Sequence, residues 1–400
     1  MINMMTAADP ASSPALTGAG GVPLFSVDDH LLEPPDLWTS RLPAKYADEC
    51  LRMRSVDGVD TWFYEDLSFP TLKMFALAGV PREQWDMGTI NYDQMLPACY
   101  DPAERSRALR VDGIVGAVTF PTAAGFAGRR FHEAKDKVLA DLSVRAYNDF
   151  MLDEWWAADR EVLVPTIICQ MWGPELAAAQ IRRCGALGAR ALTFPENTYA
   201  LGLPTLHDPV WNPMWEALSE ADIVISLHGG ASGRSFVTTP ESSFMQAVVG
   251  APIITGGEVI SELMFAKVTR DYPTLKWVIT EVGAGYLPYL LERADFEFER
   301  MSTWHGYGEL PSEVFHRCMW VPLVNERFAV EHRHLIGVDN LMWKSDSPHP
   351  ESHWPHSQDA VRGFFRRDSS RRAGQDHPRQ RRRSRVPVGC AVRTPEANRC

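Results

Sequence analysis

Residues 24–38, LFSVDDHLLEPPDLW, decide how the rest of the chain is interpreted. The stretch begins like a buried β-strand and then runs into Asp28, Asp29 and His30. One explanation is a strand that ends in solvent, with an acid in the following turn, because Asp is a common turn residue. The other is a metal site. Residues two apart on a strand point to the same side, so Asp28 and His30 present an oxygen and a nitrogen donor that together suit zinc or manganese.

Seven further apolar or β-branched runs follow, and longer amphipathic stretches separate them. With the first run, strands are expected at 24–30, 114–120, 161–169, 189–195, 222–228, 275–281, 316–321 and 341–346. Helices are expected at 131–158, 174–187, 212–221 and 286–300. Strands that alternate with helices form a parallel sheet, and eight of them close a barrel. The sequence therefore predicts an α/β fold of the (β/α)8 TIM-barrel type.

Three of the later strands end in side chains suited to a metal site. His228 ends the fifth strand, in VISLHGG, Glu281 ends the sixth, in WVITEVGAG, and Asp346 ends the eighth, in LMWKSDSPHPES. Parallel barrels carry their active sites at the C-terminal ends of the strands. Each residue has an ordinary alternative, such as a core histidine or a helix cap, but matching positions on several strands favour a site. The sequence predicts four metal ligands: Asp28, His30, His228 and Asp346.

The segment between the first two strands, residues 31–113, is far longer than an ordinary crossover. It is rich in aromatic residues, namely Trp38, Trp62, Phe63, Tyr64, Phe69, Phe75, Trp85, Tyr92 and Tyr100. A satellite core without a functional role is one interpretation. We favour a lid over the barrel mouth, because long insertions at that place more often carry function. Its rings favour an aromatic or otherwise flat, apolar substrate.

Composition is typical of a soluble globular protein. Apolar residues make up 45% of the 400 residues, and no run approaches the roughly 18–20 apolar residues of a membrane helix. Residues 1–23 are small, Pro- and Gly-rich, which predicts disorder. The seven cysteines contain no C-x-x-C pair, which argues for a reduced, cytoplasmic protein. We expect a small-molecule substrate, a homodimer, and neither nucleic acid nor a membrane as a partner.

The C-terminal region differs from the body of the chain. Residues 362–400 hold twelve Arg, no Lys and three acidic residues, so they carry +9 while the remainder carries −20. Apolar periodicity stops after Phe365, which predicts a domain over 24–366 and a disordered basic tail over 367–400. A basic arm for nucleic acid or a membrane is one explanation of the tail. We favour a shifted reading frame, because GC-rich coding sequence read out of register yields Arg-, Pro- and Ser-rich chains.

Five stretches resemble the amidohydrolase-2 branch of the amidohydrolase superfamily: FSVDDHLLEPPDLW, ALTFPEN, ISLHGG, EVGAGYLPYLLERAD and WKSDSPHPESHWPHS. The branch includes aminocarboxymuconate semialdehyde decarboxylase and the resorcylate and vanillate-type decarboxylases. The resemblance covers about residues 24–366 and implies a TIM barrel with one divalent metal ion, zinc in the first place or manganese. It implies that Asp28, His30 and His228 are ligands and that Asp346 touches both metal and substrate.

Two positions depart from the pattern of that branch. Dinuclear amidohydrolases hold a second metal with a lysine at the end of strand four, whereas that strand ends here in Thr193, Phe194 and Pro195. A mononuclear site is therefore expected. Many relatives carry a histidine at the end of strand six, where this chain has Glu281. A carboxylate accepts a proton or binds a metal, but it does not polarise an anion as an imidazolium does, which argues against a direct transfer of the decarboxylase mechanism.

These features predict a metal-dependent hydrolase. A divalent ion with an open position lowers the pKa of bound water, and the water attacks a C–N or C–O bond of an aromatic or flat apolar substrate. Asp346 is the expected general base and acid, with Glu281 and His228 as further catalytic residues. A non-oxidative decarboxylase of an aromatic or conjugated carboxylic acid is the alternative, and a catalytically decayed metal-binding protein is a second one. A serine hydrolase is disfavoured because the chain lacks G-x-S-x-G.

Other side chains are candidates for supporting contacts. His349, three residues after Asp346, is expected to orient that carboxylate. A bidentate contact to a substrate carboxylate is a possible role for an arginine, although a solvated surface position is the ordinary interpretation for each candidate. The candidates are Arg129, Arg130 and Arg234.

Overall fold

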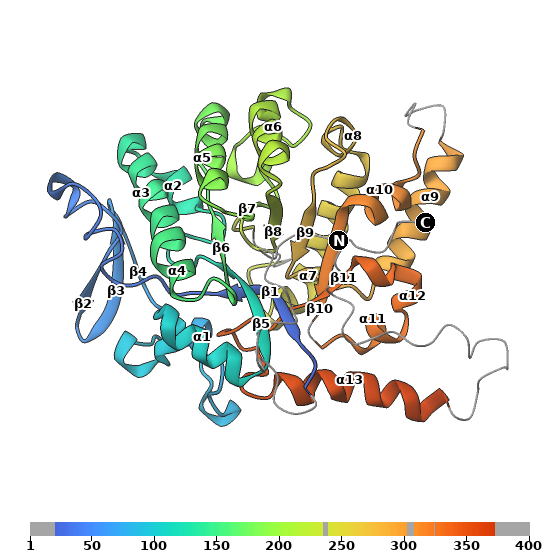
Figure 1. Cartoon of the computed structure of the whole chain (residues 1–400), viewed down its shortest axis with the longest axis horizontal. Helices are drawn as coiled ribbons and strands as arrows, with labels where there is room; N and C mark the ends of the chain where they lie inside the picture. The colour runs from blue at the N-terminus through green and yellow to red at the C-terminus, as the bar shows by residue number, and fades with distance from the viewer. Residues whose placement is uncertain (1–20, 235–238, 302–307, 324, 373–400) are drawn as a thin grey trace.

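The computed structural model describes residues 21–234, 239–301, 308–323 and 325–372 (Figure 1). Eight parallel strands are hydrogen-bonded in the order β1-β5-β6-β7-β8-β9-β10-β11 and form a nearly closed barrel. Helices surround the strands, so the (β/α)8 fold predicted from the sequence is confirmed. The strands are β1 Leu24–His30, β5 Ile114–Phe120, β6 Leu163–Ile167, β7 Ala191–Pro195, β8 Val224–His228, β9 Trp277–Thr280, β10 Met319–Leu323 and β11 Leu341–Trp343.

The helices differ from the expected ones mainly where the helical conformation is interrupted or where the apolar periodicity of the sequence is weak. The longer ones are α1 Pro102–Val111, α3 Lys137–Phe150, α5 Pro174–Ala186, α6 Asn212–Ala221, α7 Phe244–Phe265, α9 Leu287–Arg300, α10 Pro311–Cys318 and α13 Ser357–Arg372. The shorter ones are α2 Arg129–Glu133, α4 Trp156–Ala158, α8 Val268–Asp271, α11 Arg327–Glu331 and α12 Arg333–Ile336.

Two of the expected helix and strand bounds need correction. The single helix expected over 131–158 is wrong: Asp136 accepts hydrogen bonds from the backbone N–H of Val138 and Leu139 and so starts α3 as a separate helix. After α3, Met151–Trp155 forms a π-helical turn. The strand expected at 316–321 begins only at Met319, because the preceding residues are the last turn of α10.

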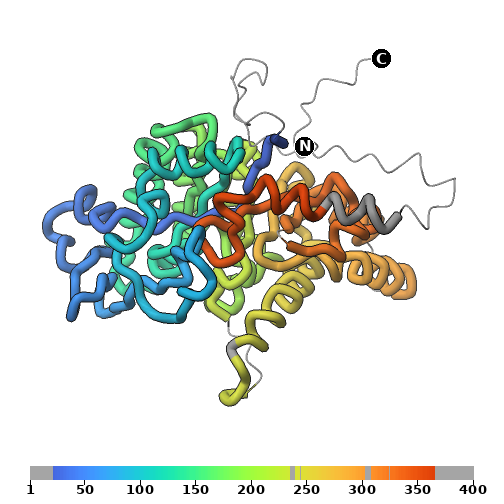
Figure 2. The backbone as a smooth tube through the Cα atoms, turned by 90° about the horizontal axis from the view of Figure 1, so that it is seen from below, coloured from blue at the N-terminus to red at the C-terminus, as the bar shows by residue number. Residues whose placement is uncertain are grey.

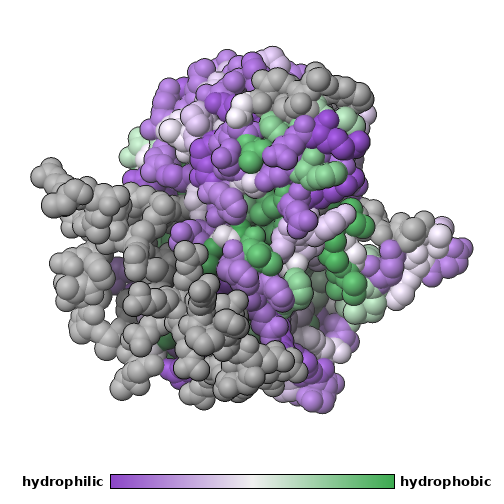
Figure 3. All heavy atoms as spheres, turned by 90° about the vertical axis from the view of Figure 1, so that its right-hand side faces the viewer, coloured by the Kyte–Doolittle hydropathy of each residue, from purple (hydrophilic) through white to green (hydrophobic). Residues whose placement is uncertain are grey.

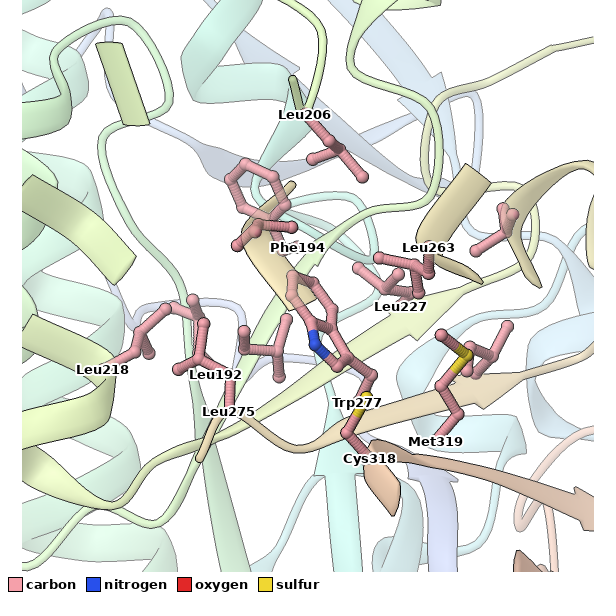
Figure 4. Packing of buried hydrophobic residues seen from close by; sticks show 14 of the residues in the cluster. Leu192, Phe194, Leu206, Leu218, Leu227, Leu263, Leu275, Trp277, Cys318 and Met319 are labelled. Atoms are coloured by element: carbon pink, nitrogen blue, oxygen red, sulfur yellow. The ribbon is translucent and has the colours of Figure 1, made fainter. Parts of the chain in front are cut away.

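Alternation along the strands decides which side chains enter the barrel. On β8, Ile225 and Leu227 belong to the outer core between sheet and helices, whereas Val224 packs inside the barrel. His228 shares the inward side of Val224, because side chains repeat every two residues on a strand. The outer core is continuous, and Figure 4 shows Trp277 at its centre among residues such as Leu227, Leu263 and Met319.

The barrel closes through the backbone on either side of β1. The N–H of Asp346 donates to the carbonyl of Asp28 at 2.9 Å, and the N–H of His30 donates to the carbonyl of Ser347 at 2.8 Å. The Ser26 hydroxyl accepts from the N–H of Ser345 at 2.7 Å. These hydrogen bonds hold the end of β1 against the segment that follows β11. Two expected ligands, Asp28 and His30, lie on β1, and a further one, Asp346, follows β11.

The insertion over 31–113 contains its own antiparallel sheet, with β2 Arg52–Val56, β3 Val59–Tyr64 and β4 Leu67–Pro70. This sheet lies outside the barrel, beside α2 and α3 (Figure 1). Its aromatic residues divide into two groups. Trp38 and Tyr64 pack against Phe131 of α2, with ring centroids 5.8 and 5.5 Å apart. Trp62 and Phe69 line a cavity that is described below.

The ends of the described chain meet at α13. The N–H of Val22 donates to Gln358, and the Gln358 amide donates to the carbonyls of Val22 and Gly113. Val361 is buried in the core. Helix α13 continues to Arg372 and so includes the first six residues of the basic tail predicted over 367–400, whose disorder stays a prediction. The rest of the predicted tail, 373–400, and residues 1–20 of the predicted N-terminal disorder lie outside the described residues.

Helix α7 corrects the statement that no segment approaches a membrane helix. Met245–Phe265 is long and apolar enough, by length and composition only, to cross a membrane, and a third of its window is buried. The helix projects from the barrel (Figure 2), and in Figure 3 apolar side chains gather on the side from which it projects. Core helices of soluble proteins pass the same test, so we assign no membrane role to α7.

The anchoring of α13 predicts the outcome of two truncations. A chain that ends at Phe365 keeps Gln358 and Val361 and should retain the Tm of the full chain. A chain that ends at His356 loses the hydrogen bonds of Gln358 and the buried side chain of Val361. Its Tm should therefore fall by several degrees. Differential scanning calorimetry measures both. Equal Tm values for the two truncated chains would contradict the role given to α13.

Candidate metal centre

Four donor atoms converge at the C-terminal end of the barrel. The Nε2 atoms of His30 and His228 are 3.1 Å apart. The Asp28 carboxylate places Oδ1 at 3.5 Å from His30 Nε2 and 3.6 Å from His228 Nε2. The Asp346 Oδ1 atom lies 3.6 Å from His30 Nε2. All four side chains are buried, so the structure brings together the four residues that the sequence proposed as ligands.

The two imidazole rings are in the neutral form, which can donate a lone pair to a metal ion. The ring Nδ1 of His228 is 2.7 Å from the carbonyl of Gly229, and this contact places the proton on Nδ1 and leaves Nε2 free to bind. Burial, with a smaller contribution from Lys344, lowers the pKa of His228 to about 3. Burial also holds the pKa of His30 well below its usual value. Both rings are therefore neutral at pH 7, the form in which histidine binds a metal.

Two carboxylates sit on strained backbone just after strand ends. Glu281 follows β9 with φ of 59°, and Asp346 lies three residues after β11 with φ of 58°. A left-handed conformation costs a non-glycine residue about 1–3 kcal/mol and is concentrated at functional sites. Gly229 makes room for this turn, since a Cβ there would lie 2.9 Å from the Glu281 carbonyl oxygen. The strain turns both carboxylates toward the histidines and Asp28.

Glu281, which follows β9, has a positively charged partner. Its carboxylate contacts the ammonium of Lys344, a buried lysine at the end of β11. The same Nζ lies 3.5 Å from Asp28 Oδ2 and 3.9 Å from Asp346 Oδ1. Burial alone would lower the pKa of Lys344, but the carboxylates of Asp346, Asp28 and Glu351 outweigh it and raise that pKa. The centre therefore contains a fixed positive charge.

The donors fit a divalent metal ion. Both carboxylate oxygens of Asp28 and Oδ1 of Asp346 are buried without a hydrogen-bond partner among the described residues. Buried carboxylate oxygens normally have partners. A cation beside the imidazoles would satisfy Asp28 Oδ1 and Asp346 Oδ1, while Asp28 Oδ2 faces Lys344 Nζ at 3.5 Å. Imidazole nitrogens together with carboxylate oxygens suit zinc and manganese. Three overlapping groups have ligand atoms within 4.8 Å of one another: Asp28, His30 and His228; His30, Asp346 and His349; Asp28, Glu281 and Asp346.

Supporting side chains hold the first strand in place. His349 lies with Nδ1 at 3.2 Å from Asp346 Oδ1, and its ring stacks on His30 with centroids 3.8 Å apart. Asp29 points away from the donors, accepts from the Ser26 hydroxyl at 2.7 Å and lies 3.5 Å from the buried Arg105 guanidinium. Arg105 also donates to the carbonyl of His30 at 2.6 Å. Asp28 therefore faces the donor atoms, whereas Asp29 binds Ser26 and lies beside Arg105.

A cavity of about 280 Å³ opens beside these donors. Its wall is shared by the insertion and the loop after β5, and it includes Phe75 and Phe126. The Phe126 ring lies 4.4 Å from the His228 ring and 4.9 Å from the His30 ring, so this side chain separates the cavity from the imidazoles, and none of the four donor residues is part of the cavity lining. The remaining aromatic lining residues are Trp62, Phe69 and Tyr92.

One arginine of the cavity has a free charged end. The Arg130 guanidinium lies over the Phe69 ring at 3.4 Å, and its Nε donates to the carbonyl of Ala123. Among the described residues, its two terminal nitrogens have no hydrogen-bond partner. Burial lowers the pKa of Arg130 to about 10, against the opposing effect of Glu33 and Glu133. Arg130 is half-buried rather than a solvated surface residue, whereas Arg129 pairs with Glu133 and Arg234 pairs with Glu258.

Three functional positions escaped sequence reasoning. Lys344 was detectable as the one cation inside LMWKSD, at the end of an otherwise apolar strand. Glu33 is buried and accepts from the N–H of Ala123 at 2.7 Å and of Ala124 at 3.0 Å, which fixes the loop that carries Phe126 and leads into α2 with Arg130. Glu196 accepts from the N–H and hydroxyl of Ser232 and fixes the loop after His228. Both glutamates lie in stretches that resemble the family, Glu33 in FSVDDHLLEPPDLW and Glu196 in ALTFPEN. Their roles could not be inferred from the sequence, because their hydrogen-bond partners are distant along the chain.

Similar solved structures share this fold at low sequence identity. An amidohydrolase from Mycobacterium avium subsp. paratuberculosis is 21% identical with a TM-score of 0.68, over 87% of this chain and 96% of that one. A 5-carboxyvanillate decarboxylase from Novosphingobium aromaticivorans, complexed with manganese and 4-hydroxy-3-methoxy-5-nitrobenzoic acid, is 16% identical with a TM-score of 0.58, over 86% and 91%. A dihydroxybenzoic acid decarboxylase from a Polaromonas species, with manganese and 2-nitroresorcinol, is 16% identical with a TM-score of 0.53, over 85% and 90%. No curated protein matches the chain in sequence.

The barrel and its donors define a metal-dependent TIM-barrel enzyme, a hydrolase or a decarboxylase. The family described as amidohydrolase matches residues 59–374, and the chain belongs to this family. The match contains seven of the eight barrel strands. Zinc as the particular ion stays a prediction, since the two decarboxylases above hold manganese.

Loss of one imidazole should weaken metal binding without unfolding the barrel. His228→Ala removes a nitrogen donor from a buried centre, so its affinity for Mn²⁺ should fall by about 100-fold or more, beyond the 10–100-fold typical of residues that only support ligands. Isothermal titration calorimetry of the metal-free protein gives the affinity, and circular dichroism checks the fold. His207→Ala is the matched control, because His207 is exposed and pairs with Glu262 away from the donors. Equal affinities of the two variants would refute the assignment.

Proposed function

We propose that this enzyme decarboxylates a small aromatic carboxylic acid without a redox cofactor. The observation that carries the proposal is the cavity beside the donors, which combines five aromatic side chains with the free guanidinium of Arg130. Aromatic walls favour a flat ring, and a guanidinium favours a carboxylate or phenolate. The substrate class is therefore an anionic aromatic molecule.

The size of the cavity supports a single-ring substrate. Its volume of about 280 Å³ lies at the lower limit of the roughly 300–1,000 Å³ found for small-molecule sites. Hydrolysis would have to accommodate an acyl or amide substituent and an attacking water in the same space. Decarboxylation requires only the ring and its own carboxylate.

The apolar cover of the centre supports loss of carbon dioxide. Phe126 and Phe120 pack against His228, and Phe75 packs against His349 with centroids 5.6 Å apart. A carboxylate moved into such surroundings loses hydration, whereas the departing carbon dioxide is uncharged, so the change of medium favours the reaction. A divalent ion held by Asp28, His30, His228 and Asp346 would supply a Lewis acid for the substrate carboxylate and a neighbouring oxygen.

Asp346 is the residue we assign to proton transfer. Burial raises the pKa of Asp346, but Lys344 and His349 outweigh it and lower that pKa. The carboxylate is therefore ionised at pH 7, and it takes up a proton from water before it delivers one to the ring carbon that bears the substrate carboxylate. The bond to the carboxylate carbon then breaks, its electron pair restores the aromatic ring, and carbon dioxide leaves. Asp346 is then ionised again, so one proton is consumed for each substrate. His349 keeps the carboxylate oriented, and Arg130 holds the anionic group on the far side of the ring.

Hydrolysis, which the sequence favoured, remains the second candidate because of one observation. Glu281 stands at the end of β9, where many decarboxylases of the branch are expected to have a histidine, and a carboxylate suits a general base for water. The difference between this glutamate and a histidine is reduced by Lys344, because its ammonium provides beside Glu281 the positive charge that a glutamate lacks.

The reaction can be decided by the products. Protein loaded with Mn²⁺ or with Zn²⁺ is incubated with a panel of hydroxybenzoic acids labelled with ¹³C at the carboxylate and with the matching phenyl esters. We expect labelled carbon dioxide and the corresponding phenol from at least one acid. Hydrolysis of esters without carbon dioxide release would overturn the proposal in favour of the second candidate.

Arg130 should control substrate affinity in that assay. Arg130→Met keeps the length and the apolar contact to Phe69 but removes the charge, so KM should rise by about tenfold or more, as expected for a charge-assisted hydrogen bond of about 1.5–3 kcal/mol. At pH 7 Arg130 is protonated, because its pKa of about 10 is higher. The KM of the natural protein should therefore rise as pH passes through 10, while that of the variant stays flat. Arg107→Met is the control, since Arg107 is exposed on α1.

A further inference from the structure

The acidic residues of the centre form two overlapping groups around one shared residue. Asp28 belongs with His30 and His228 through Oδ1, and it belongs with Glu281 and Asp346 in a second group of three carboxylates. Its other oxygen, Oδ2, points toward the second group, where it lies 3.5 Å from Lys344 Nζ. Asp28 therefore has the geometry of a ligand that bridges two cation positions.

The second position already contains a cation. Lys344 Nζ contacts the Glu281 carboxylate and lies 3.5 and 3.9 Å from oxygens of Asp28 and Asp346. These are all three members of the second group. The side chain is 4% exposed, so the ammonium is buried among these carboxylates. The first position contains neutral imidazole nitrogens and carboxylate oxygens but no protein cation among the described residues.

We propose that Lys344 serves as a built-in replacement for a second metal ion and restricts the centre to one. This inference rests on the metal-dependent function proposed above and deepens it. The ammonium occupies the second cation position, binds Glu281 and leaves the two histidines, Asp28 Oδ1 and Asp346 to a single divalent ion. The absence of a lysine at the end of strand four removes one ligand for a second ion, and Lys344 removes the space and the charge for it.

Charge balance supports this arrangement. Asp28, Glu281 and Asp346 bring three negative charges to a largely buried centre, which is unfavourable unless cations compensate for them. One ammonium and one divalent ion balance these three charges, and a fourth carboxylate, Glu351 at 3.5 Å from Lys344 Nζ, is more than half exposed and therefore screened by solvent. Without the lysine, a single divalent ion would leave one buried negative charge, and a second ion would be attracted to the vacated carboxylates.

The test is the number of metal ions bound per chain, which needs no substrate. Full-length protein is stripped with a chelator, reloaded with excess Mn²⁺, desalted and measured by elemental analysis and electron paramagnetic resonance. The natural protein should hold one Mn²⁺ per chain and show the spectrum of an isolated ion. Lys344→Met, which is close in length but uncharged, should hold two per chain and show spin coupling between neighbouring ions.

Three further variants make the result specific. Lys344→Arg keeps the charge and should stay at one ion. The double variant Lys344→Met with Glu281→Gln should return to one ion, because a carboxylate of the second position is gone. Lys276→Met, which removes a lysine paired with Asp222 outside the centre, should stay at one. Lys344→Gln replaces the methionine variant if that variant fails to fold, with the same expected count of two.

The outcomes separate this inference from the proposed function. One ion per chain in both the natural protein and the folded Lys344→Met or Lys344→Gln variant would overturn the role of Lys344 and leave the metal centre intact. Two ions in the natural protein would overturn it as well. A natural protein that binds no Mn²⁺ and no Zn²⁺ would overturn both this inference and the function on which it rests.

Discussion

The structure depends on the backbone seam that closes the barrel between its first and last strands. Asp346 donates its N–H to the carbonyl of Asp28, and His30 donates its own to the carbonyl of Ser347. Because these bonds involve the ligand residues themselves, closing the barrel and assembling the donors are one event. More than 300 residues separate the two sides of the seam, so the donors meet only when all eight strands are in place. Arg105 strengthens the seam by donating to the carbonyls of His30 and Ser347.

Burial and charge then give the centre its chemistry. The imidazoles are neutral because they are buried, and the three carboxylates lie close together around the ammonium of Lys344. The strained backbone of Glu281 and Asp346 is maintained by these contacts and by the close approach that Gly229 permits. The insertion after β1 adds an aromatic wall, and Glu33 connects it to the loop that carries Phe126 and leads into α2 with Arg130. The donors and the cavity thus lie on the two sides of Phe126.

Much of this arrangement could be predicted from the sequence, for a physical reason. Barrel strands read as short apolar runs, and their ends lie at one face of the molecule, so Asp28, His30, His228 and Asp346 could be brought together without coordinates. Contacts between side chains that are distant in sequence could not be predicted in this way. Lys344 looked like the polar end of a strand, and its contact with Glu281 depends on the positive φ of that glutamate. The helix expected over 131–158 failed because apolar periodicity continues through the break that Asp136 imposes, and α7 was missed because its apolar residues are not confined to one face.

Anomalous diffraction from crystals grown with Mn²⁺ tests the central claim most directly. The account predicts one strong anomalous peak per chain, within coordination distance of His30 Nε2, His228 Nε2 and oxygens of Asp28 and Asp346, with Lys344 Nζ still among the carboxylates of Asp28, Glu281 and Asp346. A peak at any other place in the barrel, or no peak in crystals of protein saturated with the ion, would contradict it.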